Sequence, residues 1–177
     1  MQYTKENART LADLKIAAFK KTLDLAPAVI DALRKFDGKS ITGNKKRITD
    51  AIKAVDPALY VDIEWDQWLK TKFNITYWEK NRCVRIDESV QYIDGFFDLL
   101  GYFYAKDNIL NFADVEKEIL AQCERIRAYI EKAQYTADNI ETIREKQKKL
   151  CQELNDLVRE CDHEIAGKFD VTMTYYK

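Results

Sequence analysis

Apolar residues recur at steps of three and four through Phe112 to Ile165, a stretch without glycine or proline. Such steps place side chains on one side of an α-helix, and the Glu, Lys, Arg, Gln, Ala, Leu and Ile that dominate here favour helix. The pattern predicts either one helix of roughly 80 Å or a two-helix hairpin. The apolar stripe comprises Ile119, Cys123, Ile126, Ile130, Ala133, Ala137, Ile140, Ile143, Leu150, Leu154, Leu157, Cys161 and Ile165.

The alternative with two helices places the break between Tyr135 and Asn139, where Asp138 is suited to cap a second helix and Glu141 follows three residues later. From Ile126 to Ile140 the repeat stays close to the coiled-coil period. Because burial of the apolar face supplies most of a helix's stability, this stripe has to pack against another segment or another chain. We expect the rest of the chain to provide this packing; the alternative is a homodimer through the long helix.

The first third of the chain also has helical periodicity. Thr4 to Leu25 predicts an amphipathic helix, and Ala26 to Phe36 a second one with Pro27 in its first turn, where a missing N–H costs little. Gly38 is predicted to end it. Ile48, Ile52 and Val55 mark a third helix that stops before Pro57.

Period two replaces the helical period after Pro57. Three strands of an antiparallel meander are predicted at Tyr60–Trp65, Phe73–Trp78 and Cys83–Ile86, with Glu79–Arg82 as a tight turn. The bulky run Val90–Tyr104 predicts a buried helix, because it is apolar nearly all round; an exposed aromatic docking patch is the alternative. The alternation of Phe169, Val171, Met173 and Tyr175 predicts a terminal strand that joins the sheet.

These elements predict an α+β fold: N-terminal helices, a small antiparallel sheet of three to four strands with helices over one face, and a long C-terminal helix or helical hairpin closed by a strand. We expect an α+β globular part at 1–111 and a helical arm at 112–177, folding as one cooperative unit.

Composition limits the classes of protein to which this chain can belong. In 177 residues the hydrophobic share is 46%, ample for a core. No apolar signal segment opens the chain, and its most apolar run carries Asp94 and Asp98, so a cytoplasmic protein without a membrane span is expected. The net charge is −1, but the charges are unevenly distributed along the chain. The first segment, Met1 to Lys53, is basic, with 12 Lys and Arg against 6 Asp and Glu, and such an uneven charge distribution can steer partners.

Catalytic and metal-binding patterns are absent from the sequence. The four cysteines form no C-x-x-C pair, and the lone histidine, His163, follows Cys161 by two residues, so the two point in different directions on a helix. Gly38-Lys39-Ser40 lacks the earlier glycine of a phosphate loop. We therefore expect a non-enzymatic protein with no cofactor and no metal. Enzymatic chemistry that leaves no local signature stays a minor alternative.

A basic connector is the candidate anion site. Lys39, Lys45, Lys46 and Arg47 surround the start of the third helix, whose N-terminal dipole favours an anion. These four residues are the predicted contacts for nucleic acid.

The same connector carries one resemblance. The sequences K-F-D-G-K at Lys35–Lys39 and N-K-K-R at Asn44–Arg47 resemble a helix–loop–helix phrase of small uncharacterised accessory proteins from phages and integrative elements. It covers about 13 of the 177 residues. Many proteins of that setting act as stoichiometric inhibitors or adaptors, including inhibitors of host nuclease defences, so the resemblance favours binding over catalysis.

The sequence thus favours a protein-binding module, an inhibitor or adaptor, that presents the sheet's aromatic residues and an acidic helical arm to a protein partner. Nucleic-acid binding through the Lys39–Arg47 connector is the alternative. The predicted partner contacts are Trp65, Trp68, Trp78, Glu153, Asp156 and Glu160.

Overall fold

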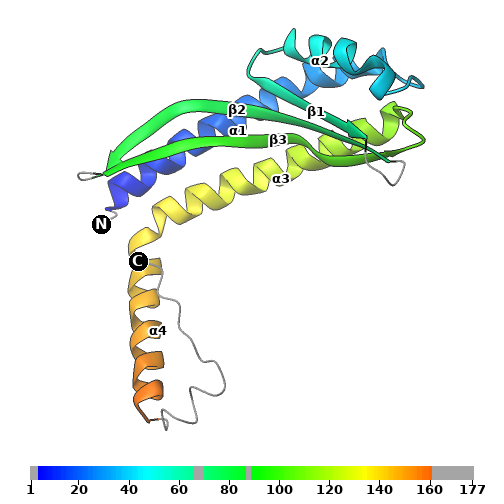
Figure 1. The fold of residues 1–177 in the computed structure, drawn as a ribbon. Helices are drawn as coiled ribbons and strands as arrows, with labels where there is room; N and C mark the ends of the chain where they lie inside the picture. The colour runs from blue at the N-terminus through cyan, green and yellow to red at the C-terminus, as the bar shows by residue number, and fades with distance from the viewer. Residues whose placement is uncertain (1–3, 66–69, 87–88, 161–177) are drawn as a thin grey trace. The chain divides into compact units, whose positions relative to one another are not determined.

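The computed structural model describes residues 4–65, 70–86 and 89–160, with the backbone alone at 80–86, 89–95, 106, 158 and 159 (Figure 1). Contacts divide the chain into two compact units, Met1–Asp138 and Asn139–Lys177. The helical stretch that begins at Phe112 is therefore shared between the two units. None of the described helices is both long and apolar enough to span a bilayer.

Helix α1 (Lys5–Arg34) opens the first unit and corrects the predicted pair of N-terminal helices. The Thr4 hydroxyl caps it by accepting a hydrogen bond from the Asn7 N–H at 3.2 Å. Pro27 lies inside the helix, not at the start of a second one. The apolar stripe continues on both sides of Pro27, so core burial offsets the cost of the missing backbone hydrogen bond.

After α1, Gly38 adopts a positive φ of 67°, which glycine tolerates at no steric cost, and the chain turns away from the helix axis. A short 3₁₀ turn, η1 (Thr42–Asn44), leads into α2 (Lys45–Lys53), which confirms the third predicted helix. Ile48 and Ile52 of α2 are fully buried.

An antiparallel sheet in the order β1-β2-β3 follows. Strand β1 (Leu59–Trp65) confirms the first predicted strand. Strand β2 (Lys70–Ile86) runs through Glu79–Arg82, so the predicted tight turn there is wrong, and the second and third predicted strands are one. The strand continues here because β3 pairs with this segment along its length. A register shift between Glu79 and Arg82 accommodates the irregular sequence.

Strand β3 (Ser89–Lys106) corrects the helix predicted at Val90–Tyr104. Thr76 pairs with Asp98 and Ile75 with Leu100, so Leu99 is an extra residue at a bulge. Leu99 and Leu100 are both fully buried. This bulge breaks the alternation of period two and produces apolar steps of three and four that mimic a helix.

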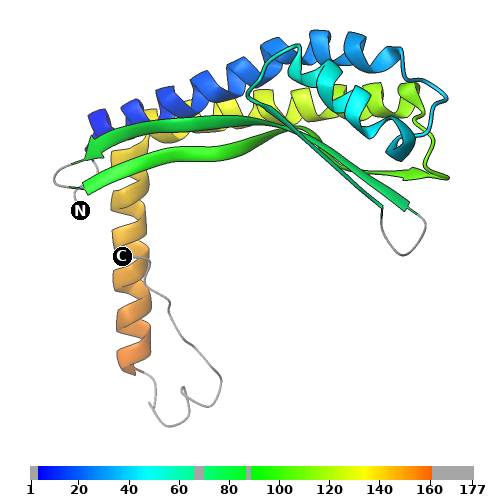
Figure 2. The same cartoon turned by 45° about the horizontal axis from the view of Figure 1, so that its top comes forward.

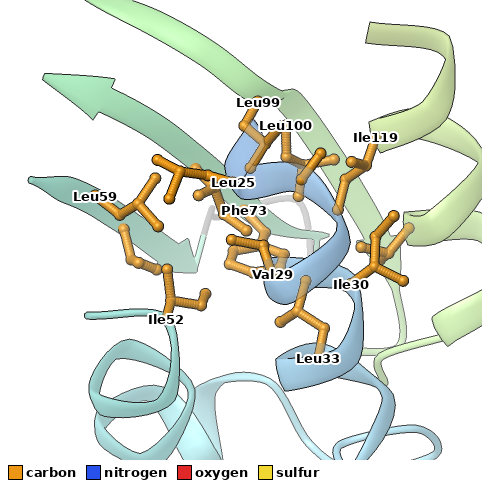
Figure 3. Close-up of a cluster of buried hydrophobic side chains, with 14 of the residues drawn as sticks. Leu25, Val29, Ile30, Leu33, Ile52, Leu59, Phe73, Leu99, Leu100 and Ile119 are labelled. Atoms are coloured by element: carbon orange, nitrogen blue, oxygen red, sulfur yellow. The ribbon is translucent and has the colours of Figure 1, made fainter. Parts of the chain in front are cut away.

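Helix α3 (Phe112–Asp138) packs beside α1 along one face of the sheet, antiparallel to it (Figures 1 and 2). Ion pairs join the two helices at both ends, Arg34 to Glu116 and Arg9 to Asp138. Figure 3 shows how side chains from α1, α2, α3 and the sheet meet in one core. Its members include Leu25, Val29, Leu33, Ile52, Leu59, Phe73, Leu99, Leu100 and Ile119. Each such burial stabilises the fold by about 1.5–3 kcal/mol.

The second unit contains α4 (Ile140–Glu160). The structure thus resolves the open question in favour of two helices, with the break at Asn139, one residue after the predicted cap. The terminal strand predicted at Phe169–Tyr175 lies outside the described residues. The α+β class, the long C-terminal helices and the three-stranded antiparallel sheet are confirmed.

Candidate functional site

The two faces of the sheet differ sharply. One face packs on α1 and α3 and buries Leu59, Val61, Ile63, Phe73 and Ile75. The opposite side, called the open face here, carries large side chains that stay exposed. Its described residues are Tyr60, Asp62, Glu64, Lys70, Lys72, Asn74, Thr76, Trp78, Phe96, Asp98, Tyr102 and Tyr104.

Three aromatic rings from three strands lie together at one end of the open face, with Phe96 between the other two. The Phe96 ring stacks on Trp78 at 5.9 Å between centroids and lies 6.0 Å from Tyr60. Phe96 is 60% exposed, Tyr60 51% and Trp78 39%. Strand alternation and pairing position them, because Trp78 pairs with Phe96 across β2 and β3. The result is a contiguous exposed aromatic cluster on the sheet.

At the other end of the open face, the Lys72 ammonium group contacts two carboxylates and one aromatic ring. Its Nζ lies 3.3 Å from the Glu64 carboxylate, 3.8 Å from that of Asp62 and 4.4 Å from the centre of the Tyr102 ring. Desolvation alone would lower the pKa of Lys72. The hydrogen bond and charge of Glu64, aided by Tyr102 and Asp62, instead raise that pKa above its ordinary value. Lys72 is therefore a cation at physiological pH.

Asp98 occupies the centre of the open face. Partial desolvation raises the pKa of Asp98 above its ordinary value, and a hydrogen bond from the Asn74 side chain opposes that rise. Thr76, which pairs with Asp98, is buried, and among the described residues its hydroxyl has no hydrogen-bond partner.

The balance of charge on this face is negative. Between the Lys72–Tyr104 pair and the Trp78–Phe96 pair, a span of about 20 Å at strand rise, three carboxylates (Asp62, Glu64 and Asp98) face one ammonium group, Lys72. Lys70, at the start of β2, is on the same face, so its described charges are three carboxylates and two ammonium groups. Such a surface is suited to a partner that presents cations beside apolar groups.

The predicted aromatic contacts fall in different places. Trp78 is in the aromatic cluster. Trp65 has the parity of the buried Ile63, so it lies on the helix-facing side at the end of β1, where it remains 50% exposed. Trp68 lies outside the described residues.

Phe96, Tyr102 and Tyr104 were not predicted as individual site residues, because Val90–Tyr104 was interpreted as a buried helix and an exposed aromatic patch there was only the alternative. Two glycines, Gly95 and Gly101, among aromatic and β-branched residues were the signal that favoured a strand.

The basic connector is less available than its sequence implies. The Lys45 ammonium donates a hydrogen bond to the Ile63 carbonyl at 2.7 Å, and Lys39 donates to the Lys35 carbonyl while its Nζ lies 5.6 Å from the centre of the Phe36 ring. Arg47 donates to the Asn44 side chain at 3.4 Å. Lys46 is exposed. The structure therefore gives two of the four cations a local structural partner on the backbone.

Asn108 explains why the connector has its shape. Its amide nitrogen donates to the hydroxyls of Ser40 at 2.9 Å and Thr42 at 2.7 Å. Its amide oxygen accepts from the Thr42 N–H at 3.0 Å and the Thr71 hydroxyl at 2.9 Å. Asn108 has a φ of 57°. The connector is thus a polar joint that links α1 and α2 to the turn before α3.

The predicted acidic contacts lie on α4, in the second unit. Glu153 and Glu160 are exposed, and Glu153 forms an ion pair with Lys149 at 3.9 Å. Asp156 is exposed on the same helix. These carboxylates therefore belong to a different unit from the aromatic cluster.

Nucleophilic and metal chemistry finds little support among the described residues. They contain no group of three metal-ligating side chains. Cys123 is buried, and burial raises the pKa of its thiol, with Arg127 opposing and Glu124 adding to the shift. A raised pKa makes a thiol a poor nucleophile at neutral pH. Cys83, Cys161 and His163 have no described side chain.

Comparison of the chain with protein-family models, curated proteins and solved structures finds no match. What the chain does must therefore be inferred from its own residues.

Proposed function

We propose that this chain is a non-catalytic protein-binding module and that the open face of its sheet is the binding surface. The observation that supports this most strongly is the cluster of Tyr60, Trp78 and Phe96, three exposed rings of which Phe96 contacts the other two. Contiguous exposed aromatic surface is uncommon on a monomer, and aromatic side chains dominate the energetic centres of protein interfaces.

The charges around the cluster define the partner's chemistry. Asp62, Glu64 and Asp98 favour a protein surface that carries Lys or Arg around an apolar patch. Because the rings project from paired strands, little conformational entropy is lost when they are covered. A stoichiometric inhibitor or adaptor, in the setting that the Lys35–Arg47 resemblance implies, would use such a rigid preformed face.

The alternative, nucleic-acid binding through Lys39–Arg47, has weaker support. Exposed aromatic rings can stack on bases, yet the rings here lie among carboxylates, and a stacking platform for nucleic acid normally adjoins a cationic groove. Only Lys46 and Arg47 extend the connector's positive charge without a bond to the backbone of the fold.

A subtractive capture experiment tests the proposal. The wild-type chain, a Phe96→Ser/Trp78→Ser variant and a Leu120→Ser control are immobilised and exposed to lysate of the native host. Leu120 is 53% exposed on α3, away from the sheet face, so it matches Phe96 in exposure. A protein that the wild type and control retain in stoichiometric amount, and that the double variant loses by about tenfold or more, would support the open face. Equal retention by all three chains would rule this surface out.

Fluorescence anisotropy tests the alternative. Labelled single- and double-stranded DNA and RNA are titrated at two salt concentrations against the wild type and a Lys46→Glu/Arg47→Glu variant, which leaves the Lys45–Ile63 bond in place. We expect no tight binding. Binding that weakens steeply with salt and is lost in the variant would replace the present proposal with nucleic-acid recognition.

A further inference from the structure

The apolar stripe of α4 follows a strict heptad. Positions a and d alternate at steps of three and four, and only one of the six positions, Gln147, is polar. The seam consists of Ile140, Ile143, Gln147, Leu150, Leu154 and Leu157. Leu150 is 64% exposed, Leu157 58% and Leu154 39%. A helix of this amphipathicity is stable only when such a seam is covered.

The surface of α4 already has the shape of a coiled-coil seam. A shallow apolar groove is lined by Ile143, Lys146, Gln147, Leu150, Cys151 and Leu154. In a coiled coil each incoming side chain fits between four residues at i, i+3, i+4 and i+7. The groove contains two overlapping sets of that kind, one from Ile143 to Leu150 and one from Gln147 to Leu154.

Charge on α4 is divided between its halves. From Ile140 to Leu150 there are four cations and two carboxylates, whereas from Cys151 to Glu160 there are three carboxylates and one cation. The helix is therefore net positive in its first half and net negative in its second. A second copy that runs in the opposite direction matches this distribution at both ends.

We infer that α4 pairs with α4 of a second copy of this chain as an antiparallel two-stranded coiled coil. In the register that places Leu154 opposite Ile143 of the second copy, every apolar seam position meets a seam position. Lys146 and Glu153 occupy two of the g positions, and g positions face one another between antiparallel helices. Each Lys146 then meets Glu153 of the other copy, twice per dimer, and no like charges meet.

Competing arrangements lack this match. In a parallel pair, position g faces position e of the next heptad, so Lys146 would meet Cys151 and Glu153 would meet Val158. Sliding the antiparallel pair by one heptad in one direction brings Glu153 against Glu153, and sliding it in the other brings Lys146 against Lys146. The pairing does not use the open face, so it is independent of the proposed function.

A heterotypic charge swap tests the inference on the full chain. In Lys146→Glu and in Glu153→Lys each homodimer acquires two like-charge pairs, and we expect dimer affinity to fall by roughly tenfold or more. An equimolar mixture of the two variants forms heterodimers in which both pairs are opposite in charge, so affinity should return. Sedimentation equilibrium measures all three species, and circular dichroism checks that each variant keeps its helices.

Two further variants complete the test. Leu150→Asn/Leu157→Asn should abolish the dimer, whereas Leu120→Asn, a matched exposed leucine on α3, should leave it intact. A wild-type chain that is monomeric at about 100 µM would overturn the inference, since the seam would then be covered within the chain or by another protein. A dimer that survives Leu150→Asn/Leu157→Asn, or a variant mixture that fails to recover affinity, would overturn it too.

Discussion

Helices α3 and α4 follow one another in the sequence and carry similar apolar stripes. The stripe of α3 is largely buried, whereas that of α4 is largely exposed. On α3, Val115, Ile119 and Ile126 are buried to 1% exposure or less. On α4, Leu150 and Leu157 are more than half exposed. The periodicity of a helix therefore shows which side is apolar but does not show what covers it.

The difference arises before α3 begins. Asn108 fixes the turn that leads into α3, and the Phe112 N–H donates to the Asp37 carboxylate at 2.9 Å, so the start of the helix is held against the connector. From there α3 runs along α1 and β3. On α4 the described residues leave Leu150 and Leu157 more than half exposed, so these side chains have to be covered from elsewhere.

The largest expected effect contrasts one residue from each stripe. Ile119→Ala removes a fully buried side chain and should lower the free energy of unfolding by about 2–4 kcal/mol, through lost burial and a residual cavity. Leu150→Ala, measured at low concentration, should change it by less than about 0.5 kcal/mol. Urea unfolding followed by tryptophan fluorescence reports the first unit, where all three tryptophans lie. Equal losses would show that the α4 stripe is covered within the chain.

The polar joint is the next test. Asn108→Ala removes four hydrogen bonds of the side chain and leaves a β-carbon at positive φ, so we expect a loss of about 2–3 kcal/mol in unfolding free energy. Asn108→Gly loses the same bonds without the strain and should be about 1 kcal/mol less damaging. If both variants unfold like the wild type, the turn does not determine how α3 is held.

Cysteine reactivity compares the two helices directly. Cys123 on α3 is 4% exposed, and burial raises the pKa of its thiol, whereas Cys151 on α4 is partly exposed. In variants that keep one of these cysteines and carry serine at the other three positions, iodoacetamide at pH 7.5 should label Cys151 about tenfold faster or more. Similar rates would mean that α3 opens readily or that α4 is covered.

The smallest effect concerns the open face of the first unit. The pKa of Asp98 is raised, so the folded state binds a proton more readily than the unfolded chain, and the ionised carboxylate costs some stability. Asp98→Asn should therefore stabilise the fold slightly at pH 7, by well under 1 kcal/mol, because solvent screens this exposed group. The advantage should shrink as pH falls through the raised pKa and vanish below about pH 3. Thermal unfolding from pH 3 to 7 measures it; an advantage that grows with acidity would contradict the shift.

Local pattern predicted much of the fold. The alternation of Val61 and Ile63 predicted β1, the spacing of Ile48 and Ile52 predicted α2, and the helical stripes and the α+β class were also correct. For the candidate site, Trp78 was predicted, while Phe96, Tyr102 and Tyr104 were not. In the first unit, the period of the apolar residues equals the period of the element where that element lies against the core on one side only.

Tertiary contacts decided the rest, since they override a local period wherever the backbone departs from it. The bulge at Leu99 turns two consecutive leucines inward and makes a strand resemble a helix. Pairing with β3 carries β2 through a predicted turn, and core burial carries α1 through Pro27. The sequence alone determined which residues are apolar and at what period they recur. Only the assembled structure decided which of those faces are buried, because that depends on segments far apart in the chain coming together.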